Sequence, residues 1–170
     1  MIIRHETPSD YEEVYKMVKK SFETTSYSDG TEADYLNMVR TKSTFISDLS
    51  FVAETDNSKI VGQIVLYRTF IETDIGNIET LVMSPLSVHP DYFRKGIARK
   101  LVHHALNKAA DMGYSSVFLC GDAEIYRKFG FEPSFKFSVY HKSDPKAQWC
   151  MGKELIEGSL KNISGKIDIV

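Results

Sequence analysis

The stretch of sequence that determines the fold is PLSVHPDYFRKGIARKL, residues 85–101. An apolar strand ends at Val88, a basic loop containing Gly96 follows, and an amphipathic helix begins. The helix is predicted over residues 96–113, because its apolar residues recur every three to four positions and Gly113 stands where a C-terminal cap is expected. The first amides of a helix have no partner inside it, so this loop predicts an anion site.

The side chains around the start of that helix favour a phosphate ligand. Arg94, Lys95 and Arg99 add positive charge, and the small Gly96 and Ala98 would let a phosphate approach the backbone closely. The alternative interpretation is an ordinary capped surface helix with solvated lysines.

The flanking sequence predicts a mixed α/β fold. A capped helix is expected over 8–22, a shorter one around 35–39, a short helix over 123–129, and strands over 51–55, 60–71, 78–88, 114–120, 135–141, 148–155 and weakly 166–170. Strand, crossover helix and strand are typical of a parallel pair, here 78–88 with 114–120. Pro85 would remove a hydrogen bond inside its strand, so we expect the sheet to open nearby.

Composition limits the class of protein. The 170 residues are 42% hydrophobic and 26% charged, which is typical of one folded domain. A net charge of −2 gives no basic field for nucleic acid or an anionic membrane, so neither is expected as a partner. The two cysteines, Cys120 and Cys150, form no framework, and the start of the sequence does not look like a signal peptide. We therefore expect reduced thiols, no structural disulfide and a cytoplasmic location.

Two motifs resemble the GNAT superfamily of acyl-CoA-dependent N-acetyltransferases. The first, a V-x-P strand end followed by [Q/R]-x-x-G-x-[G/A], stands here as VHP at 88–90 and FRKGIA at 93–98. The second, Y-x-x-x-G-F, stands as YRKFGF at 126–131. The resemblance runs from residue 2 to about 139, and the tail looks like the bacterial YhbS-like branch. The departure is Phe93, where the family usually has Gln or Arg.

The resemblance implies a fold and an activity. The fold would be a single GNAT-like domain over 1–170, with a core over 2–139 and C-terminal strands over 140–170. Its mostly antiparallel sheet would splay at a central parallel strand pair, with helices on both faces. The activity would be direct transfer of an acetyl group from acetyl-CoA to a primary amine of a small molecule or peptide. The alternative is a non-catalytic acyl-CoA-binding sensor or interaction module, and a homodimer is left open.

The resemblance also implies which residues bind coenzyme A. The expected set is Leu86, Ser87 and Val88 on the strand, and Phe93, Arg94, Lys95, Gly96, Ile97, Ala98 and Arg99 at the loop and helix start. The strand would hold the pantetheine arm and the loop amides the pyrophosphate. No metal is expected, because the amides and the helix end supply the positive potential.

Tyr126 matches the family position beside the sulfur, where its phenol would donate a proton to the leaving thiolate; a packing tyrosine is the alternative. The Val88 amide would meet the charge that develops on the carbonyl oxygen. Some members carry a Glu base where Val82 stands, and Glu79 is the nearest upstream carboxylate, about 10 Å away along a strand. Asp122 and Glu124 are comparable candidates.

Other conspicuous residues have ordinary explanations. Cys120 is expected to be an inert strand cysteine. His103 and His104 are adjacent on a helix, about 100° apart, so they cannot chelate one metal and are expected at the surface. Tyr27 and its polar loop are candidates for lining the acceptor pocket.

Overall fold

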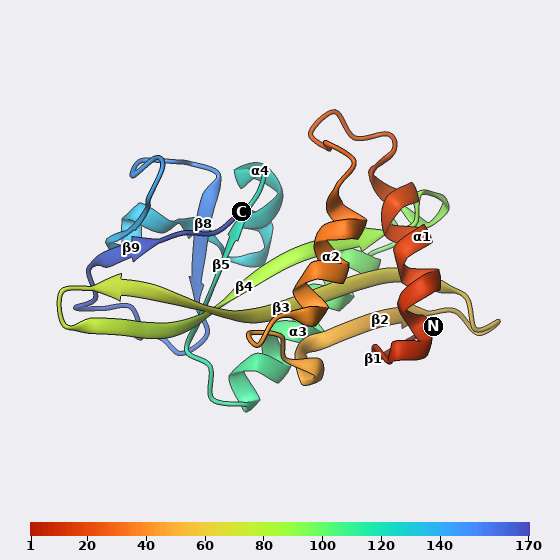
Figure 1. Ribbon diagram of the computed structural model, residues 1–170, viewed down its shortest axis with the longest axis horizontal. Coiled ribbons are helices and arrows are strands. Elements are labelled where there is room, and N and C mark those ends of the chain that lie inside the picture. Colours follow the sequence, from red (N-terminus) through yellow and green to blue (C-terminus); the bar gives the residue numbers. More distant parts are fainter. The chain divides into compact units, whose positions relative to one another are not determined.

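Nine strands and four α-helices make up the fold, which is drawn in Figure 1. The computed structural model describes residues 1–170 and contains two compact units, Met1–Tyr67 with Ser84–Lys108 and Arg68–Met83 with Ala109–Val170. The elements are β1 (Ile2–His5), α1 (Tyr11–Phe22), α2 (Glu32–Thr41), β2 (Ser50–Glu54), β3 (Ile60–Thr73), β4 (Gly76–Val88), α3 (Ile97–Asp111), β5 (Ser116–Cys120), α4 (Ala123–Tyr126), β6 (Glu132–Pro133), β7 (Val139–His141), β8 (Cys150–Glu154) and β9 (Gly165–Ile167).

The strands follow the order β1-β2-β3-β4-β5-β8-β6, with β9 pairing with β3 and β7 with β9. The pairs β1–β2, β2–β3, β5–β8, β6–β8 and β3–β9 are antiparallel, whereas β4–β5 and β7–β9 are parallel. This confirms a mixed, mostly antiparallel sheet with a parallel pair formed by the strands on either side of α3.

The parallel pairing of β4 with β5 is short. Its register contains Leu81 opposite Val117 and Val82 opposite Phe118 and then ends, although β5 continues to Cys120 in register with β8. The ladder therefore stops just before the cis Ser84–Pro85 peptide bond. This agrees with the opening that the proline predicts.

In the first unit, α1 and α2 cover one face of the strands and α3 covers the other (Figure 1). The approach of α3 is close at Gly62, where a Cβ atom would lie 2.9 Å from Leu101 Cδ1 and 3.0 Å from Ile97 Cγ2. The register of β2 against β3 shifts beside Gly62, as expected for a bulge. The fully buried side chains of this unit include Val14, Leu36, Leu49, Phe51, Ile64 and Leu101.

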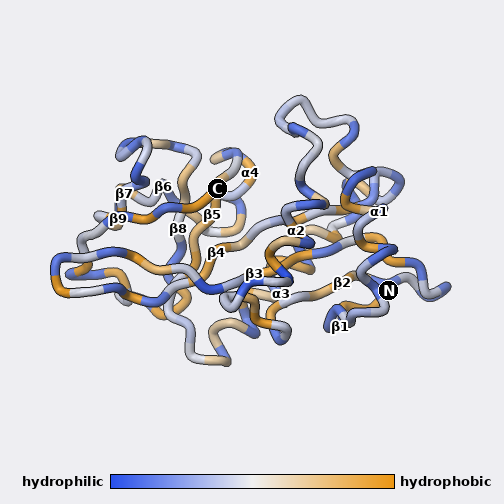
Figure 2. Tube along the Cα trace, viewed as in Figure 1, coloured by the Kyte–Doolittle hydropathy of each residue, from blue (hydrophilic) through white to orange (hydrophobic).

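In the second unit, β5 lies between β4 and β8, and the short α4 follows it. Figure 2 shows hydrophobic residues concentrated along β4 and β5. The fully buried side chains of this unit include Ile71, Leu81, Phe118, Leu119, Phe131 and Met151. None of the helices in the molecule has both the length and the apolar character that a membrane span requires.

One predicted strand is wrong over half of its length. Residues Ser134–Phe137 form a 3-10 turn, and the strand begins only at Val139. Ser138 separates the two with a left-handed backbone, φ 59°. The aromatic residues at 135 and 137 suggested a strand, but a turn that ends in a left-handed residue cannot continue a β-ladder.

Candidate functional site

The chain that leaves β4 is fixed to β3 before it turns. The His89 amide donates to the Val61 carbonyl at 2.8 Å, and His89 Nδ1 accepts from the Asp91 amide at 3.2 Å. Burial, with a smaller contribution from the positive charge of Lys59, lowers the pKa of His89. A neutral imidazole is the form in which Nδ1 can accept, so the ring caps this turn.

Left-handed residues then shape the loop between the strand and α3. Arg94 has φ 61° and Gly96 has φ 78°. Such residues turn successive amides into a concave surface that suits an anion. Arg94 tolerates this conformation with a side chain, whereas Gly96 adopts it at no steric cost.

Gly96 also stands immediately before the first residue of α3. Its carbonyl accepts from the Lys100 amide at 3.1 Å, which is the first bond of the α3 ladder. The amides of Ile97, Ala98 and Arg99 therefore have no carbonyl one turn earlier in the helix. A Cβ atom on Gly96 would meet nothing within 4 Å, so this helix end is open to an approaching ligand.

Three basic residues lie close in sequence to this helix end. Arg94, Lys95 and Arg99 are all exposed. The Lys95 ammonium lies 4.9 Å from the centre of the Tyr92 ring, a cation–π arrangement that holds it beside the loop. Phe93, at the position where the resemblance leads one to expect Gln or Arg, is 44% exposed.

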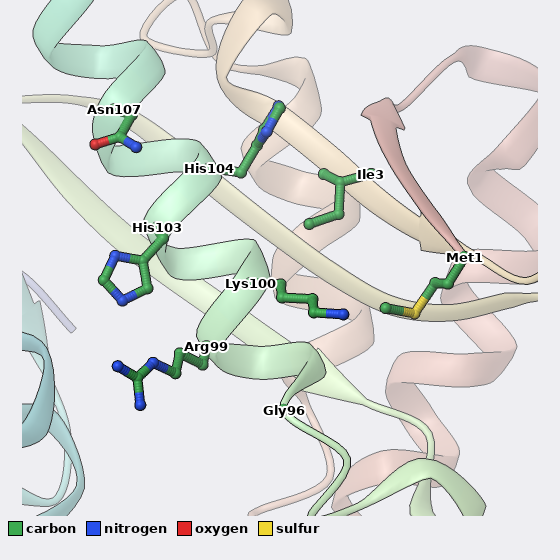
Figure 3. A pocket seen from close by; sticks show the side chains of 8 residues that line it. All are labelled: Met1, Ile3, Gly96, Arg99, Lys100, His103, His104 and Asn107. Carbon is green, nitrogen blue, oxygen red and sulfur yellow. The ribbon is translucent and has the colours of Figure 1, made fainter.

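An open groove of about 660 Å³ continues from Gly96 along α3 (Figure 3). Lys100 and His104 lie on the side of the helix that faces β1, whereas Arg99 and His103 point away from it. Both histidines are exposed, as predicted, although the His104 ring packs edge-on against Phe51, 4.7 Å between centroids. The groove is lined by Met1, Ile3, Gly96, Arg99, Lys100, His103, His104 and Asn107.

The three strand residues that were predicted to contact coenzyme A have side chains with different roles. The Ser87 hydroxyl is buried and donates to Gln63 Oε1 at 3.1 Å, so it ties β4 to β3. Leu86 and Val88 lie on the opposite face of the strand because successive side chains alternate. Ser87 therefore has a packing role of its own, whatever its backbone binds.

Tyr126 lies at the end of α4. Asp122 caps that helix, with its Oδ1 accepting from the Glu124 amide at 2.8 Å. The Tyr126 ring is half-buried and packs edge-on against Phe131, 6.1 Å between centroids. Burial, and secondarily the Asp122 charge, raise the pKa of Tyr126. A tyrosine is already protonated at neutral pH, the form that can donate a proton, and the raised pKa preserves that form.

Gly121 lies against Tyr126, a contact that is not apparent in the sequence. A Cβ atom there would lie 2.5 Å from Tyr126 Cε2, so the tyrosine ring occupies the space of the missing side chain. The Gly121 amide donates to the Trp149 carbonyl at 2.9 Å, which fixes the backbone under the ring. The only sequence signal is the small residue before the capping Asp122.

Glu79 is not close to Tyr126. It is exposed on β4 and hydrogen-bonds Tyr114, whose pKa is raised by burial and then by the Glu79 charge. Tyr114 precedes β5 and Tyr126 follows it, and β5 alone is about 13 Å long. The structure therefore does not bring Glu79 and Tyr126 together, and the identity of the base stays a prediction.

The other candidate carboxylates are exposed and lie beside Tyr126 in sequence. Asp122 is engaged as the cap of α4, and Glu124 follows it in the first turn. Val82, near the point where the resemblance implies an acid in some members, is fully buried.

Comparison with known proteins agrees with this geometry. Residues 2–134 match the family model described as the acetyltransferase (GNAT) domain. The chain belongs to the GNAT acetyltransferase family. It is 30% identical over 132 residues to the uncharacterized N-acetyltransferase YhbS of Escherichia coli K12, covering 78% of this chain and 74% of that protein. It is also 27% identical over 137 residues to the uncharacterized N-acetyltransferase YjhQ of the same strain, and the match covers 78% of this chain and 75% of YjhQ.

Solved structures of this GNAT fold are similar over nearly the whole chain. The crystal structure of Escherichia coli YhbS in complex with CoA has a TM-score of 0.85 at 24% identity and covers 99% of this chain and 89% of that one. A GNAT acetyltransferase from Brucella melitensis in complex with acetyl-CoA has a TM-score of 0.79 at 23% identity and covers 99% and 95%. At these identities the similarity establishes the fold.

Proposed function

We propose that this protein transfers an acetyl group from acetyl-CoA to a primary amine by direct transfer. The observation that carries the proposal is the open start of α3 at Gly96, in a chain that belongs to an acetyltransferase family. An unobstructed helix end with three amides that lack helical partners is an anion site by its own chemistry. Coenzyme A has a pyrophosphate that fits such a site.

The chain divides the binding of coenzyme A between the strand and the loop. The amides of Ile97, Ala98 and Arg99 would hold the pyrophosphate, and the side chains of Arg94 and Arg99 add charge around it. The backbone of Leu86 and Val88 would pair with the pantetheine arm. Similar proteins crystallised with CoA and with acetyl-CoA support this assignment.

Two groups of this chain would serve the reaction itself. The Val88 amide would donate to the carbonyl oxygen as negative charge develops on it. Tyr126 Oη would give its proton to the departing sulfur, and its raised pKa keeps that proton in place until then. The amine must arrive neutral, because only its free electron pair can attack the carbonyl carbon.

The proposal is tested by following thiol release from acetyl-CoA with a panel of primary amines. We expect Tyr126→Phe to lower turnover by about 10²- to 10⁴-fold, the usual contribution of a general acid, with coenzyme A affinity changed by less than about twofold. Tyr114→Phe is the matched control, because Tyr114 also has a raised pKa but lies at the other end of β5. Unchanged turnover in Tyr126→Phe would remove the acid role from this residue.

The second candidate function is a non-catalytic acyl-CoA-binding module. It is favoured by Phe93 at the position where Gln or Arg is expected, and by the buried Val82 near the point where the resemblance places an acid in some members. Glu79 and Tyr126 also lie beyond opposite ends of β5. In that case the wild-type protein would bind acetyl-CoA and release no thiol with any amine. Binding together with amine-dependent thiol release would exclude it.

A further inference from the structure

The two cysteines of the sequence face each other across neighbouring strands. Cys120 is the last residue of β5 and stands directly opposite Cys150, the first residue of β8. Both are free thiols, and their side chains are close enough to perturb each other's ionisation. Sequence spacing gives no sign of this pairing, because it depends on the register of two strands 30 residues apart.

The hydrogen-bond pattern shows what kind of strand pair the cysteines form. At one end of the ladder the Leu155 amide donates to Ser115 O, and at the other the Gly121 amide donates to Trp149 O. Hydrogen-bonded and non-hydrogen-bonded pairs alternate, so the pair Cys120–Cys150 is non-hydrogen-bonded. Opposite Cα atoms in such pairs lie about 4.5 Å apart, within the range that a disulfide spans.

The surroundings act on the two thiols in opposite directions. The contact with Cys150, together with burial, raises the pKa of Cys120. The contact with Cys120 lowers the pKa of Cys150 to about 7, against the opposing effect of burial. The Ser134 hydroxyl, 3.3 Å from Cys150 Sγ, and the nearby His141 act in the same direction. Cys150 is buried and Cys120 is partly exposed, so solvent reaches the pair through Cys120.

The Cys120 side of the pair is also tied to the end of the chain. Its thiol lies 3.6 Å from the Ile169 carbonyl, which also contacts His141 Nε2 at 2.7 Å. The pair is therefore held in place by packing on several sides, and two sulfurs kept together in this way are pre-positioned to join.

We propose that Cys120 and Cys150 are a dithiol modification site that forms a reversible intramolecular disulfide with peroxides. A thiolate of the pair attacks one oxygen of hydrogen peroxide, releases hydroxide and becomes a sulfenic acid. The second sulfur then attacks the sulfenic sulfur, the S–S bond forms, and the oxygen leaves as water. In total, two thiols and one peroxide give one disulfide and two waters.

The test treats the full-length reduced protein with hydrogen peroxide under native conditions. We expect both free thiols to disappear together, the mass to fall by two hydrogens, and dithiothreitol to restore both changes. Digestion without reduction should give one linked peptide pair that contains both cysteines. Two free thiols after treatment, or a link between two molecules, would overturn the proposal.

Single variants distinguish two cysteines that react as a pair from two cysteines that react independently. In Cys120→Ser and in Cys150→Ser, the remaining thiol has no resolving partner, so peroxide should add oxygen atoms to it. Ser134→Ala should slow disulfide formation in the wild-type pair by about threefold or more, because one donor to the thiolate is lost. Phenylarsine oxide, which binds two neighbouring thiols at once, is a second probe that needs no variant, and failure to bind it would count against the proposal.

A consequence for the site follows from the position of Gly121, immediately after Cys120 and under the Tyr126 ring. This step rests on the proposed function. The disulfide should restrain the backbone beside Gly121 and lower amine acetylation, with recovery in dithiothreitol and no such loss in Cys150→Ser. A disulfide without any change in turnover would refute only this coupling, whereas absence of turnover in the reduced protein would refute the acetyltransferase itself.

Discussion

A single missing side chain positions the proposed acid. The Tyr126 ring occupies the volume that a Cβ atom at position 121 would need. We predict that Gly121→Ala displaces the ring and lowers turnover by about tenfold or more, with coenzyme A affinity unchanged, because a positioning error of about 1 Å can cost up to a hundredfold. Steady-state kinetics alongside calorimetric binding separate the two effects.

The double variant shows whether the alanine acts through the tyrosine. If it does, Gly121→Ala together with Tyr126→Phe should be no slower than Tyr126→Phe alone, since residues that act as a unit are not additive. Multiplicative losses would mean that Gly121 matters for another reason.

Asp10 stabilises the start of α1 through its ionised form. Its carboxylate accepts from Arg4 at 2.8 and 2.9 Å and from the Thr7 amide at 2.8 Å. The hydrogen bonds from Arg4, which outweigh burial, lower the pKa of Asp10 to about 2. A carboxyl with a depressed folded-state pKa contributes stability above its unfolded value of 3.8 and loses it as the pH falls toward 2.

We therefore predict that Asp10→Asn lowers the free energy of unfolding at pH 7 by about 1–2 kcal/mol and has a smaller effect near pH 2. Urea titrations of both proteins at pH 7, 4 and 2 measure this difference. If Asp10→Asn lowered the free energy of unfolding by the same amount at every pH, the charge of Asp10 would not contribute to stability.

At the scale of elements, the distance between α3 and β3 decides where the helix begins relative to the sheet. Gly62 permits this contact, because a Cβ atom there would press on Leu101 and Ile97. We predict that Gly62→Ala destabilises the fold by about 1–3 kcal/mol, the usual cost of overpacking. Urea denaturation measures this change.

Gly62→Ala combined with Leu101→Ala should recover part of that loss relative to Leu101→Ala alone, since the added methyl then fills vacated space. No coupling between the two positions would mean that the close approach is not what Gly62 provides.

Elements with strong local signals are the ones the sequence predicts well. The four-residue apolar repeat and Gly113 correctly predicted α3, which ends at Asp111, and the cap at Thr7 and Pro8 correctly predicted the helical turn leading into α1. The segment 135–141 failed because its aromatic residues fit a strand as well as a packed turn, and only the left-handed Ser138 decides between them. Such choices depend on tertiary packing.

The candidate site residues also divide into those with a local signal in the sequence and those without one. The loop from Phe93 to Arg99 could be predicted, because its charge, glycine and helix start are consecutive in the sequence. Two contacts could not be predicted, that of Gly121 with Tyr126 and that of Cys120 with Cys150. Both depend on how β5, β8 and α4 pack. The distance between Glu79 and Tyr126 likewise becomes visible only when the strands are placed.

At the scale of the whole molecule, net charge conceals a local concentration of positive charge. The chain carries −2 overall, yet Arg94, Lys95, Arg99 and Lys100 gather at one helix end. A helix end attracts anions through its own amides and dipole, so a molecule that is acidic overall can still bind a polyphosphate there. A single domain over 1–170, a cytoplasmic location and a homodimer stay predictions.

The most direct test of the account is calorimetric titration of coenzyme A and acetyl-CoA into the wild-type protein, Gly96→Glu and Gly113→Glu. Both glycines have positive φ and open space around a Cβ atom, so the two variants share the same charge and backbone strain. They stand beyond opposite ends of α3, a helix about 22 Å long. We predict that Gly96→Glu weakens binding about tenfold or more and Gly113→Glu less than about twofold. Equal affinities in all three proteins, or no binding by the folded wild type, would contradict the assignment of the α3 start as the coenzyme A site.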